Sequence, residues 1–412
     1  MKFTSLFRSS LAAATSLALG LGTTACSRDY TAAYVFATSA QTGTVSAYAV
    51  DYQSGILTQI SGSPFASQTG NPVGLVASPN NENIYVIGGT QTSAVEWFQV
   101  GTDGKLYGQK TYNITGSYPT AAAIDSTNKF LYVTFTYASP ATPGAPGPGG
   151  VTVFPINSDN SLGTPLTFGS LSYVPVGNNP VGIVVSAPTT AGNVYVYVLD
   201  QEGSTASPTA QPTVMGFQQN TSTGALSLLS GTTPALKTYQ GTNAGVTPSA
   251  IAIDPTSRYV YVTDKTANEL YSYQLAGPTN GNLTALTSSP TTTGLYPVSV
   301  TIDPRGKYLY VANYNSNTVS AFSINTATGA LGGTATGNFT TATGPTCVTI
   351  EPALGVYLYT SNYLDSSISA AKLSPNTGQL TAVANTPFIS AALPSCVAAV
   401  ANGSHASSID NP

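Results

Sequence analysis

Charged residues are scarce in this chain of 412 residues. Only 7% of the sequence is Asp, Glu, Lys or Arg, with 12 basic against 16 acidic residues. An acidic chain with so few basic residues has no electrostatic footprint for nucleic acid, which we therefore exclude as a partner. The surface must instead be covered by Ser, Thr, Asn, Gln and Gly, which gives it a neutral and hydroxyl-rich character.

Histidine is almost absent, and this limits the chemistry that can be assigned. The only histidine, His405, lies in a Ser-rich tail, where we expect a solvated loop residue. Neither a Ser-His-Asp set nor a metal site of clustered His, Cys and Asp is therefore supported. The Gly-rich stretches lack a Gly-Lys-Thr context and a following helix, so phosphate binding is not supported either. We expect no cofactor and no metal.

The apolar run near the N-terminus, Leu11 to Leu21, is too short to span a bilayer. It follows the basic residues Lys2 and Arg8 and precedes Cys26, an order typical of a signal peptide. Cysteine after Ala25 resembles a bacterial lipobox. We therefore expect a lipoprotein signal peptide at residues 1–25 and lipidation of Cys26.

Cleavage before Cys26 would leave residues 26–31 as a tether and remove two basic residues. The mature chain would then carry 10 basic against 16 acidic residues, a net charge of about −6. Thr23 departs from the leucine usually found three residues before a lipidated cysteine, so ordinary secretory cleavage stays open as the alternative. The predicted location is the bacterial cell envelope, in the periplasm or at the cell surface, with a lipid anchor in the membrane.

The stretch Pro297 to Leu331 contains a unit that the rest of the chain repeats. Strands are predicted over Val298 to Ile302, Lys307 to Ala312 and Thr318 to Ile324, and a fourth begins after Ala330. Such a four-stranded antiparallel sheet is apolar on both faces, so it is not stable alone. Copies that stack against it would bury both faces.

Seven copies of this unit are present. A tyrosine of the second strand recurs as Tyr34, Tyr85, Tyr132, Tyr195, Tyr261, Tyr310 and Tyr359. A proline opens the first strand of all but the first copy: Pro72, Pro119, Pro180, Pro248, Pro297 and Pro345. The missing first strand appears at the other end of the chain, where Pro394 to Val400 matches Pro345 to Glu351 and no second strand follows.

These repeats predict an all-β fold, a seven-bladed β-propeller of four-stranded antiparallel blades over residues 32–402. The C-terminal strand 394–400 would complete the first blade and close the ring, followed by a tail at residues 403–412. We expect one domain and a monomer.

Two cysteines, Cys347 and Cys396, occupy the same position in adjacent units. A disulfide between them is attractive in an oxidising compartment. Equivalent positions in neighbouring blades should however point the same way around the ring, against the convergent geometry that a disulfide requires. We therefore expect two buried thiols that act as small apolar fillers, with the disulfide as the alternative.

The repeats read Tyr261 to Asp264 (YVTD), Tyr310 to Asn313 (YVAN) and Tyr359 to Asn362 (YTSN), with Thr-Gly-Ala-Leu turns at Thr223 and Thr328. Over residues 30–402 they resemble the YVTN-repeat propellers and the seven-bladed lactonase superfamily that includes 6-phosphogluconolactonase. The resemblance implies a propeller and raises lactone hydrolysis as an activity. It also implies a histidine, arginines and a glutamate near the central channel, but the segments before the first strands contain neither histidine nor arginine.

The turns between first and second strands carry charges that we interpret as structural. Asp125, Asp254, Asp303 and Glu351 each begin such a turn, and a turn-capping role is expected for all four. Arg258 and Arg305 lie in the same turns, where we expect both to be solvated.

Loops after second strands and loops before first strands should emerge on one face of the ring. Two long insertions, residues 137–150 and 200–213, fall on this face, where binding residues usually lie. The candidate ligand-binding residues there are Tyr118, Asn179, Asp200, Glu202, Asp264, Lys265, Tyr296, Asn313, Tyr314, Asn362 and Tyr363. The alternative is that the tyrosines continue strand packing and the insertions are spacers.

A face rich in Tyr and Asn suits a neutral hydroxylated ligand such as a glycan, or a protein partner. The sequence therefore favours a binding or scaffolding module for a glycan or an envelope protein. The alternative is a lactonase that hydrolyses a sugar lactone with acidic residues such as Glu202 or Asp264. A purely structural repeat protein is a third hypothesis.

Overall fold

The computed structural model describes residues 30–138, 148–201, 212–229, 242–332, 337–403 and 409. The predicted signal peptide with Cys26, most of both predicted insertions, Glu202 and His405 lie outside these residues. In the part of the chain that is described, no helix has the length and apolar character needed to cross a membrane. All elements below belong to the unit Thr31–Pro412.

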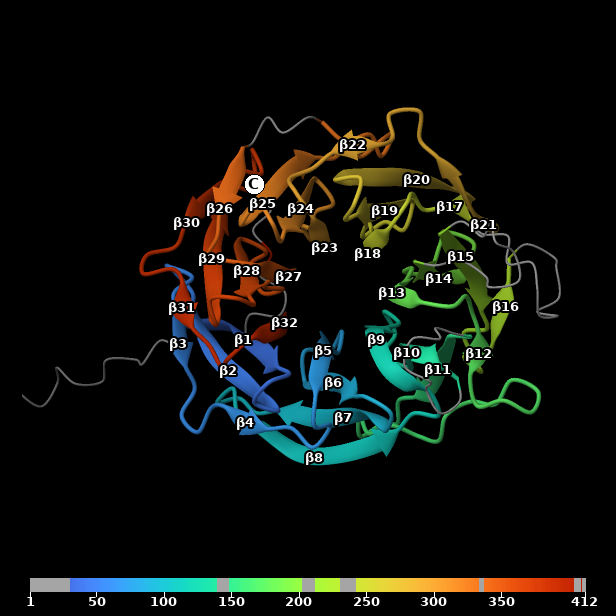
Figure 1. Ribbon diagram of the computed structural model, residues 1–412, viewed down its shortest axis with the longest axis horizontal. Helices are drawn as coiled ribbons and strands as arrows, with labels where there is room; N and C mark the ends of the chain where they lie inside the picture. Colours follow the sequence, from blue (N-terminus) through green and yellow to red (C-terminus); the bar gives the residue numbers. More distant parts are fainter. Residues whose placement is uncertain are drawn as a thin grey trace, which may run out of the picture. The chain divides into compact units, whose positions relative to one another are not determined.

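Seven antiparallel sheets stand around a common axis, as Figure 1 shows, and this confirms the predicted seven-bladed propeller. We number the blades 1 to 7 from the blade that contains β1. In blade order, the inner strands are β32 (Pro394–Ala401), β5 (Pro72–Ala77), β9 (Ser117–Ile124), β13 (Pro180–Val185), β18 (Pro248–Ile253), β23 (Pro297–Ile302) and β27 (Pro345–Ile350). The second strands are β1 (Thr31–Ser39), β6 (Asn83–Gly89), β10 (Phe130–Tyr137), β14 (Val194–Asp200), β19 (Tyr259–Asp264), β24 (Tyr308–Asn313) and β28 (Tyr357–Asn362).

The third strands follow farther from the axis, and the outer strands are short and often split in two. The third strands are β2 (Thr44–Asp51), β7 (Ser93–Val100), β11 (Gly150–Pro155), β15 (Thr213–Gln219), β20 (Glu269–Gly277), β25 (Thr318–Ser323) and β29 (Ser367–Leu373). The outer strands are β3 (Leu57–Gln59), β4 (Phe65–Ala66), β8 (Leu106–Asn113), β12 (Val174–Pro175), β16 (Leu226–Leu228), β17 (Thr242–Asn243), β21 (Asn280–Ala285), β22 (Thr291–Thr292), β26 (Asn338–Thr340), β30 (Leu380–Ala382) and β31 (Phe388–Ile389).

The fourth strand predicted after Ala330 begins later than expected. Leu331 makes only an isolated bridge to Ile324, and β26 starts at Asn338. An outer strand has a neighbour on one side only, so its pairing is weakly specified.

The C-terminal strand closes the ring as predicted. Strand β32 pairs with β1 in antiparallel register, with Tyr34 opposite Val400 and Phe36 opposite Ala398. Its other side packs on the inner strands β27 and β5 of the flanking blades. The two ends of the propeller sequence therefore share one blade.

The repeated tyrosines fasten each blade to the next. Tyr310 in β24 donates a hydrogen bond from its hydroxyl to the carbonyl of Gly378 at 2.9 Å, in the turn that ends the third strand of blade 7. Tyr308 reaches the carbonyl of Asn376 in the same turn, and a Cβ on Gly378 would lie 2.2 Å from the Tyr308 ring. Gly378 also has a φ of +71°, so this turn requires glycine on two grounds.

The prediction of two buried thiols was wrong, because Cys347 in β27 and Cys396 in β32 are bonded to each other, which was the alternative. Inner strands of neighbouring blades converge near the axis, and the two Cα atoms are only 4.9 Å apart. This separation lies within the Cα–Cα range that a disulfide requires, and it results from the crowding of inner strands at the axis. The bond joins blade 7 to the closing strand.

The turn-capping prediction is confirmed, but one arginine is not solvated as expected. The Asp303 Oδ1 accepts hydrogen bonds from the backbone N–H groups of Lys307 and Tyr308, each at 2.7 Å. Arg305 pairs with the Asp303 Oδ2 at 2.8 Å and donates to the carbonyl of Gly355 in the next blade, which leaves its side chain 2% exposed. Arg258, at the equivalent turn, is exposed as predicted.

Candidate functional site

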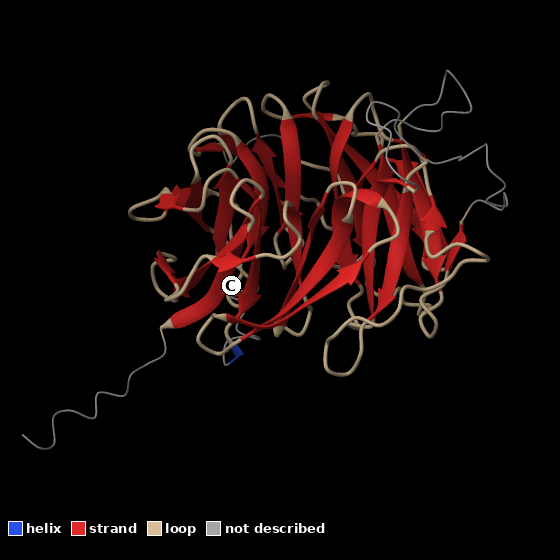
Figure 2. Ribbon diagram, turned by 60° about the horizontal axis from the view of Figure 1, so that its bottom comes forward, coloured by secondary structure: helices blue, strands red, loops and turns tan. Residues whose placement is uncertain are grey.

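Loops after the second strands and segments before the inner strands meet on one face of the ring. Tyr314 donates its N–H to the carbonyl of Tyr296 at 2.9 Å, and Tyr363 donates to Gly344 at 2.8 Å. We call this face the mouth and define it by two sets of residues. These are the described residues that connect second to third strands, and the last four before each strand-opening proline. Figure 2 shows how such loops gather at the edges of the ring of strands.

A cavity of about 330 Å³ lies on the axis below the mouth and is lined by all seven inner strands. Its lining residues are apolar or are Gly, Ser, Thr and Cys, and none of them is charged. Hydroxyls near its mouth end are already engaged between blades. Ser249 donates to the carbonyl of Pro297 at 2.6 Å, and Ser395 donates to that of Pro72 at 2.9 Å. The side chains that line this cavity offer no acid, base or charge for catalysis.

Two acidic residues of the predicted site are buried at the mouth. Asp264, fully buried, accepts hydrogen bonds from the N–H groups of Thr247 at 2.9 Å, Thr266 at 3.0 Å and Ala267 at 2.9 Å. Asp200, at the equivalent end of β14, accepts one from Asn179 at 3.0 Å. These carboxylates hold the two loops of their own blade together.

Asn313 and Asn362 end the second strands of blades 6 and 7 and are also buried. Their side-chain amides donate to Ser320 at 2.8 Å and to Ser369 at 2.9 Å in the adjacent third strands. Sequence reasoning placed them on the loop surface because the last residue of a second strand borders that loop. In the structure this residue still lies inside the sheet.

The other described candidates lie at the surface of the mouth and are partly exposed: Tyr118, Asn179, Lys265, Tyr296, Tyr314 and Tyr363. The rings of Tyr296 and Tyr314 are 6.1 Å apart between centroids, and those of Tyr118 and Tyr137 are 5.5 Å apart. Asn179 donates to the side chain of Gln201 at 3.1 Å. The mouth therefore has an aromatic sector at blade 6, a second at blade 3, and a polar sector at blade 4.

Tyr118 and Tyr296 are held in an uncommon backbone conformation. Their φ angles are +56° and +59°, in the left-handed region that non-glycine residues rarely adopt. The Tyr296 N–H is fixed by a 2.7 Å hydrogen bond to the side chain of Asn268 from the preceding blade. Strained residues that surrounding structure holds in place are common at binding sites, because they are pre-organised.

Lys265 is the only lysine or arginine among the described residues of the mouth. Its ammonium lies 6.0 Å from the centroid of the Tyr296 ring. Partial burial lowers the pKa of Lys265 below its ordinary value, and the negative charge of Asp264 opposes this shift. A partly desolvated cation beside an aromatic ring can bind a carbonyl oxygen more strongly than a solvated lysine can.

Sequence reasoning missed three apolar residues of the mouth: Val246, Leu295 and Leu364. Their side chains are exposed, although each belongs to a residue type that is usually buried. The available signal was an apolar residue inside a polar loop, outside the alternation of any strand.

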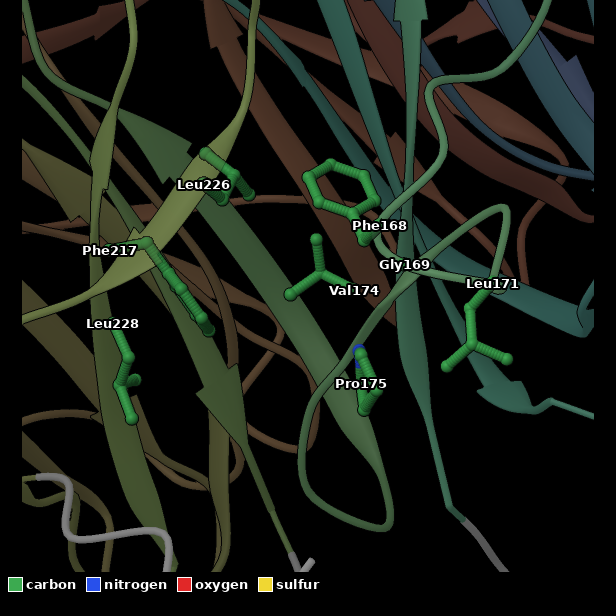
Figure 3. A pocket seen from close by; sticks show the side chains of 8 residues that line it. All are labelled: Phe168, Gly169, Leu171, Val174, Pro175, Phe217, Leu226 and Leu228. Atoms are coloured by element: carbon green, nitrogen blue, oxygen red, sulfur yellow. The ribbon is translucent and has the colours of Figure 1, made fainter. Parts of the chain in front are cut away.

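A second, larger cavity of about 480 Å³ lies between blades 3 and 4, at their outer strands β12 and β16. Figure 3 shows its wall of apolar side chains, with Phe168, Val174 and Pro175 on one side and Phe217 and Leu228 on the other. None of its described lining residues has a polar side chain, so these residues offer no group that could orient or activate a substrate. Nor do the described residues contain a group of three or more His, Cys, Asp or Glu able to hold a metal ion.

Comparison with known proteins shows the family to which the chain belongs. The family model for "Lactonase, 7-bladed beta-propeller" matches residues 30–179 and 210–350, which is more than half of the chain. The chain belongs to the seven-bladed lactonase family. A search of curated protein sequences gave no match to this lactonase-family chain.

Solved structures similar to this lactonase-family propeller share its fold at low sequence identity. A candidate 6-phosphogluconolactonase from Bacteroides uniformis is 17% identical with a TM-score of 0.68, over 90% of this chain and 100% of that one. The periplasmic gluconolactonase of Pseudomonas aeruginosa is also 17% identical with a TM-score of 0.68, over 90% and 99%. At this identity the similarity establishes the fold and does not transfer a catalytic site.

Proposed function

We propose that the chain hydrolyses a sugar lactone at the mouth of blades 5 and 6. The observation that carries this proposal is the cluster of Lys265, Tyr296 and Tyr314 on a rigid rim, in a member of a lactonase family. A tyrosine ring packs against the apolar face of a sugar ring, and the Lys265 ammonium donates hydrogen bonds to the lactone carbonyl oxygen.

The reaction adds water to the lactone carbonyl carbon and breaks the bond from that carbon to the ring oxygen. The ring oxygen takes a proton, and the resulting hydroxy acid releases its acid proton at neutral pH. Lys265 stabilises the negative charge that develops on the carbonyl oxygen. Asp200 and Asp264 are buried and engaged, and the exposed carboxylate of the described mouth, Asp365 of blade 7, accepts a hydrogen bond from Ser367 at 2.8 Å, so we assign no carboxylate base beside Lys265. We therefore expect a rate enhancement of about 10²–10³ from this one charged donor.

Binding without turnover is the second candidate function. It is favoured by the burial of both carboxylates and by the uncharged wall of the axial cavity. In this case the mouth would bind a glycan or an envelope protein through its tyrosines. It predicts affinity for a neutral sugar and no acid release.

A pH-stat assay with glucono-1,5-lactone separates the two candidates. We expect acid release above the uncatalysed rate, and a fall in kcat/KM of about 10² for Lys265→Met. Lys110→Met is the matched control, because Lys110 also lies over a tyrosine ring, that of Tyr112 at 5.1 Å, but in the outer strand β8. No acid release above background, with the sugar bound, would favour the binding module. An equal fall in kcat/KM for Lys265→Met and Lys110→Met would show that Lys265 has no specific role in the reaction.

We also propose that this activity is located at the cell envelope, through export and lipidation of Cys26. The support is the order of basic head, apolar run and cysteine in the sequence. Metabolic labelling with radioactive palmitate tests it, because the label should appear on the wild type and be lost in Cys26→Ala. An unlabelled, secreted protein would indicate ordinary cleavage instead.

A further inference from the structure

Exposed apolar side chains gather on the mouth beside the proposed lactone site. Val246 of blade 5 is 64% exposed, Leu295 of blade 6 is 58% exposed, and Leu364 of blade 7 is 56% exposed. Single exposed apolar residues are normal on a protein surface, but neighbouring ones usually mark an interaction site. These three residues lie on consecutive blades of one face, as the residues of an interaction site would.

These residues are connected to one another through the cluster already described. Thr247, next to Val246, accepts the N–H of Lys265 at 3.1 Å. The Lys265 ammonium lies 6.0 Å from the Tyr296 ring centroid, and Leu295 directly precedes Tyr296. The blade 5 and blade 6 residues of the row are thus linked through Lys265.

The second half of the row crosses from blade 6 to blade 7. The Tyr314 ring lies 6.1 Å from that of Tyr296, and both Tyr314 and Leu364 border Gly344. A Cβ on Gly344 would lie 3.0 Å from Leu364 and 3.2 Å from Tyr314, so the two side chains flank the same glycine. Gly344 keeps the space between them open. We call Val246, Leu295, Tyr296, Tyr314 and Leu364 together the shelf, with the Lys265 side chain between its blade 5 and blade 6 members.

Charge around the shelf limits what it can bind. Lys265 is the only cation of the described mouth, and the proposed reaction uses it at the lactone carbonyl. A second anionic group on the substrate, such as a phosphate or carboxylate, would have no lysine or arginine partner there and would lose hydration without compensation. An aliphatic group, in contrast, gains by covering exposed apolar side chains.

We infer that the shelf binds an aliphatic substituent of an uncharged lactone, so that alkyl-substituted lactones are preferred to unsubstituted ones. This inference rests on the proposed function for the orientation of the lactone ring at Lys265. The shelf shares Tyr296 and Tyr314 with the proposed lactone site, but Val246, Leu295 and Leu364 lie outside that site. Its readout is separate, because it is affinity as a function of alkyl chain length.

The test compares δ-valerolactone with δ-lactones that carry one, three and five additional carbons in an alkyl substituent. Binding is measured by calorimetry and turnover by pH-stat on the same protein. Full burial of one methylene corresponds to about fourfold in affinity, and a shelf covers roughly half of it, so we expect about twofold per methylene. The five-carbon substituent should therefore bind about thirtyfold more tightly than the unsubstituted ring.

Leu295→Ser with Leu364→Ser should reduce this gain by about tenfold and leave δ-valerolactone unchanged. Both side chains are exposed, so the double variant is expected to fold. Leu171→Ser is the matched control, because Leu171 is also an exposed leucine but lines the outer cavity between blades 3 and 4.

Each outcome has a distinct meaning. Affinity that rises with chain length and falls only in the double shelf variant supports the inference, whether or not turnover is seen. Affinity independent of chain length overturns it, even if all the lactones are hydrolysed. A gain that is lost in Leu171→Ser instead assigns the substituent to the outer cavity and also overturns it. Absence of turnover with normal binding rejects the proposed hydrolysis alone.

Discussion

Reduction of the Cys347–Cys396 disulfide should loosen the closure of the ring by a measurable amount. The bond closes a loop with a sequence separation of 49 residues, between the inner strands of blades 7 and 1. In the chain-entropy model a loop of this length contributes about 4 kcal/mol to the free energy of unfolding. A unit of roughly 370 residues unfolds with an entropy of about 0.8 kcal/mol/K, so loss of the bond should lower the Tm by about 5 °C.

The assay is thermal unfolding of the wild type and of Cys347→Ala with Cys396→Ala, each with and without reductant. Reductant should lower the Tm of the wild type to that of the double variant and leave the double variant unchanged. Removal of the bond leaves β32 paired with β1, so both forms should still fold. The reductant is added to unfolded protein, so that it can reach the bond, and the protein is then refolded. A wild-type Tm that is unchanged by this treatment would contradict the disulfide and favour two buried thiols.

Three further predictions follow from the blade contacts and from Lys265. Tyr310→Phe should lower the free energy of unfolding by about 1–2 kcal/mol, because it leaves the Gly378 carbonyl unpaired. Tyr132→Phe should change it little, since the buried Tyr132 hydroxyl has no hydrogen-bond partner among the described residues. Urea denaturation measures both variants, and equal losses would refute the role of the Tyr310 hydroxyl. Gly378→Ala should lower the free energy of unfolding by about 3 kcal/mol or more, because the added Cβ meets the Tyr308 ring. Gly43 has a similar φ of +63° but nothing within 4 Å of an added Cβ, so Gly43→Ala should lower it by about 1 kcal/mol in the same assay. Similar losses in the two variants would show that the contact with Tyr308 is unimportant. Burial lowers the pKa of Lys265, so the enzyme-dependent kcat/KM should fall as the pH rises through this lowered pKa, below the pKa of a free lysine. Lys265→Arg stays charged and should not show this fall. A pH profile of acid release by both proteins checks the prediction.

The fold was predictable from the sequence because each blade repeats the same local signals. The Asp-Pro turns, the tyrosine of the second strand and the Thr-Gly turns each recur, and a ring of equivalent sheets follows from them. The match between Pro394 to Val400 and Pro345 to Glu351 was enough to predict the closing strand. Each of these features depends on a residue and its neighbours in sequence, which is why a single sequence reveals them.

The site was less predictable, because burial at a strand end depends on packing between loops. Asp264 and Asn313 are residue types that often bind polar ligands, yet both are buried and form hydrogen bonds within their own blade. The disulfide was missed for a related reason, since the distance between neighbouring inner strands is set by the curvature of the ring. The exposure of Leu295 and Leu364 likewise depends on how the described loops of neighbouring blades pack, which no local sequence pattern reports.

A crystal structure of the protein with a bound aldonate, the product of lactone hydrolysis, tests the central claim most directly. The account predicts electron density on the mouth, with the sugar against the rings of Tyr296 and Tyr314 and a carboxylate oxygen within hydrogen-bond distance of Lys265. Density in the axial cavity or in the cavity between blades 3 and 4, with the mouth empty, would contradict it.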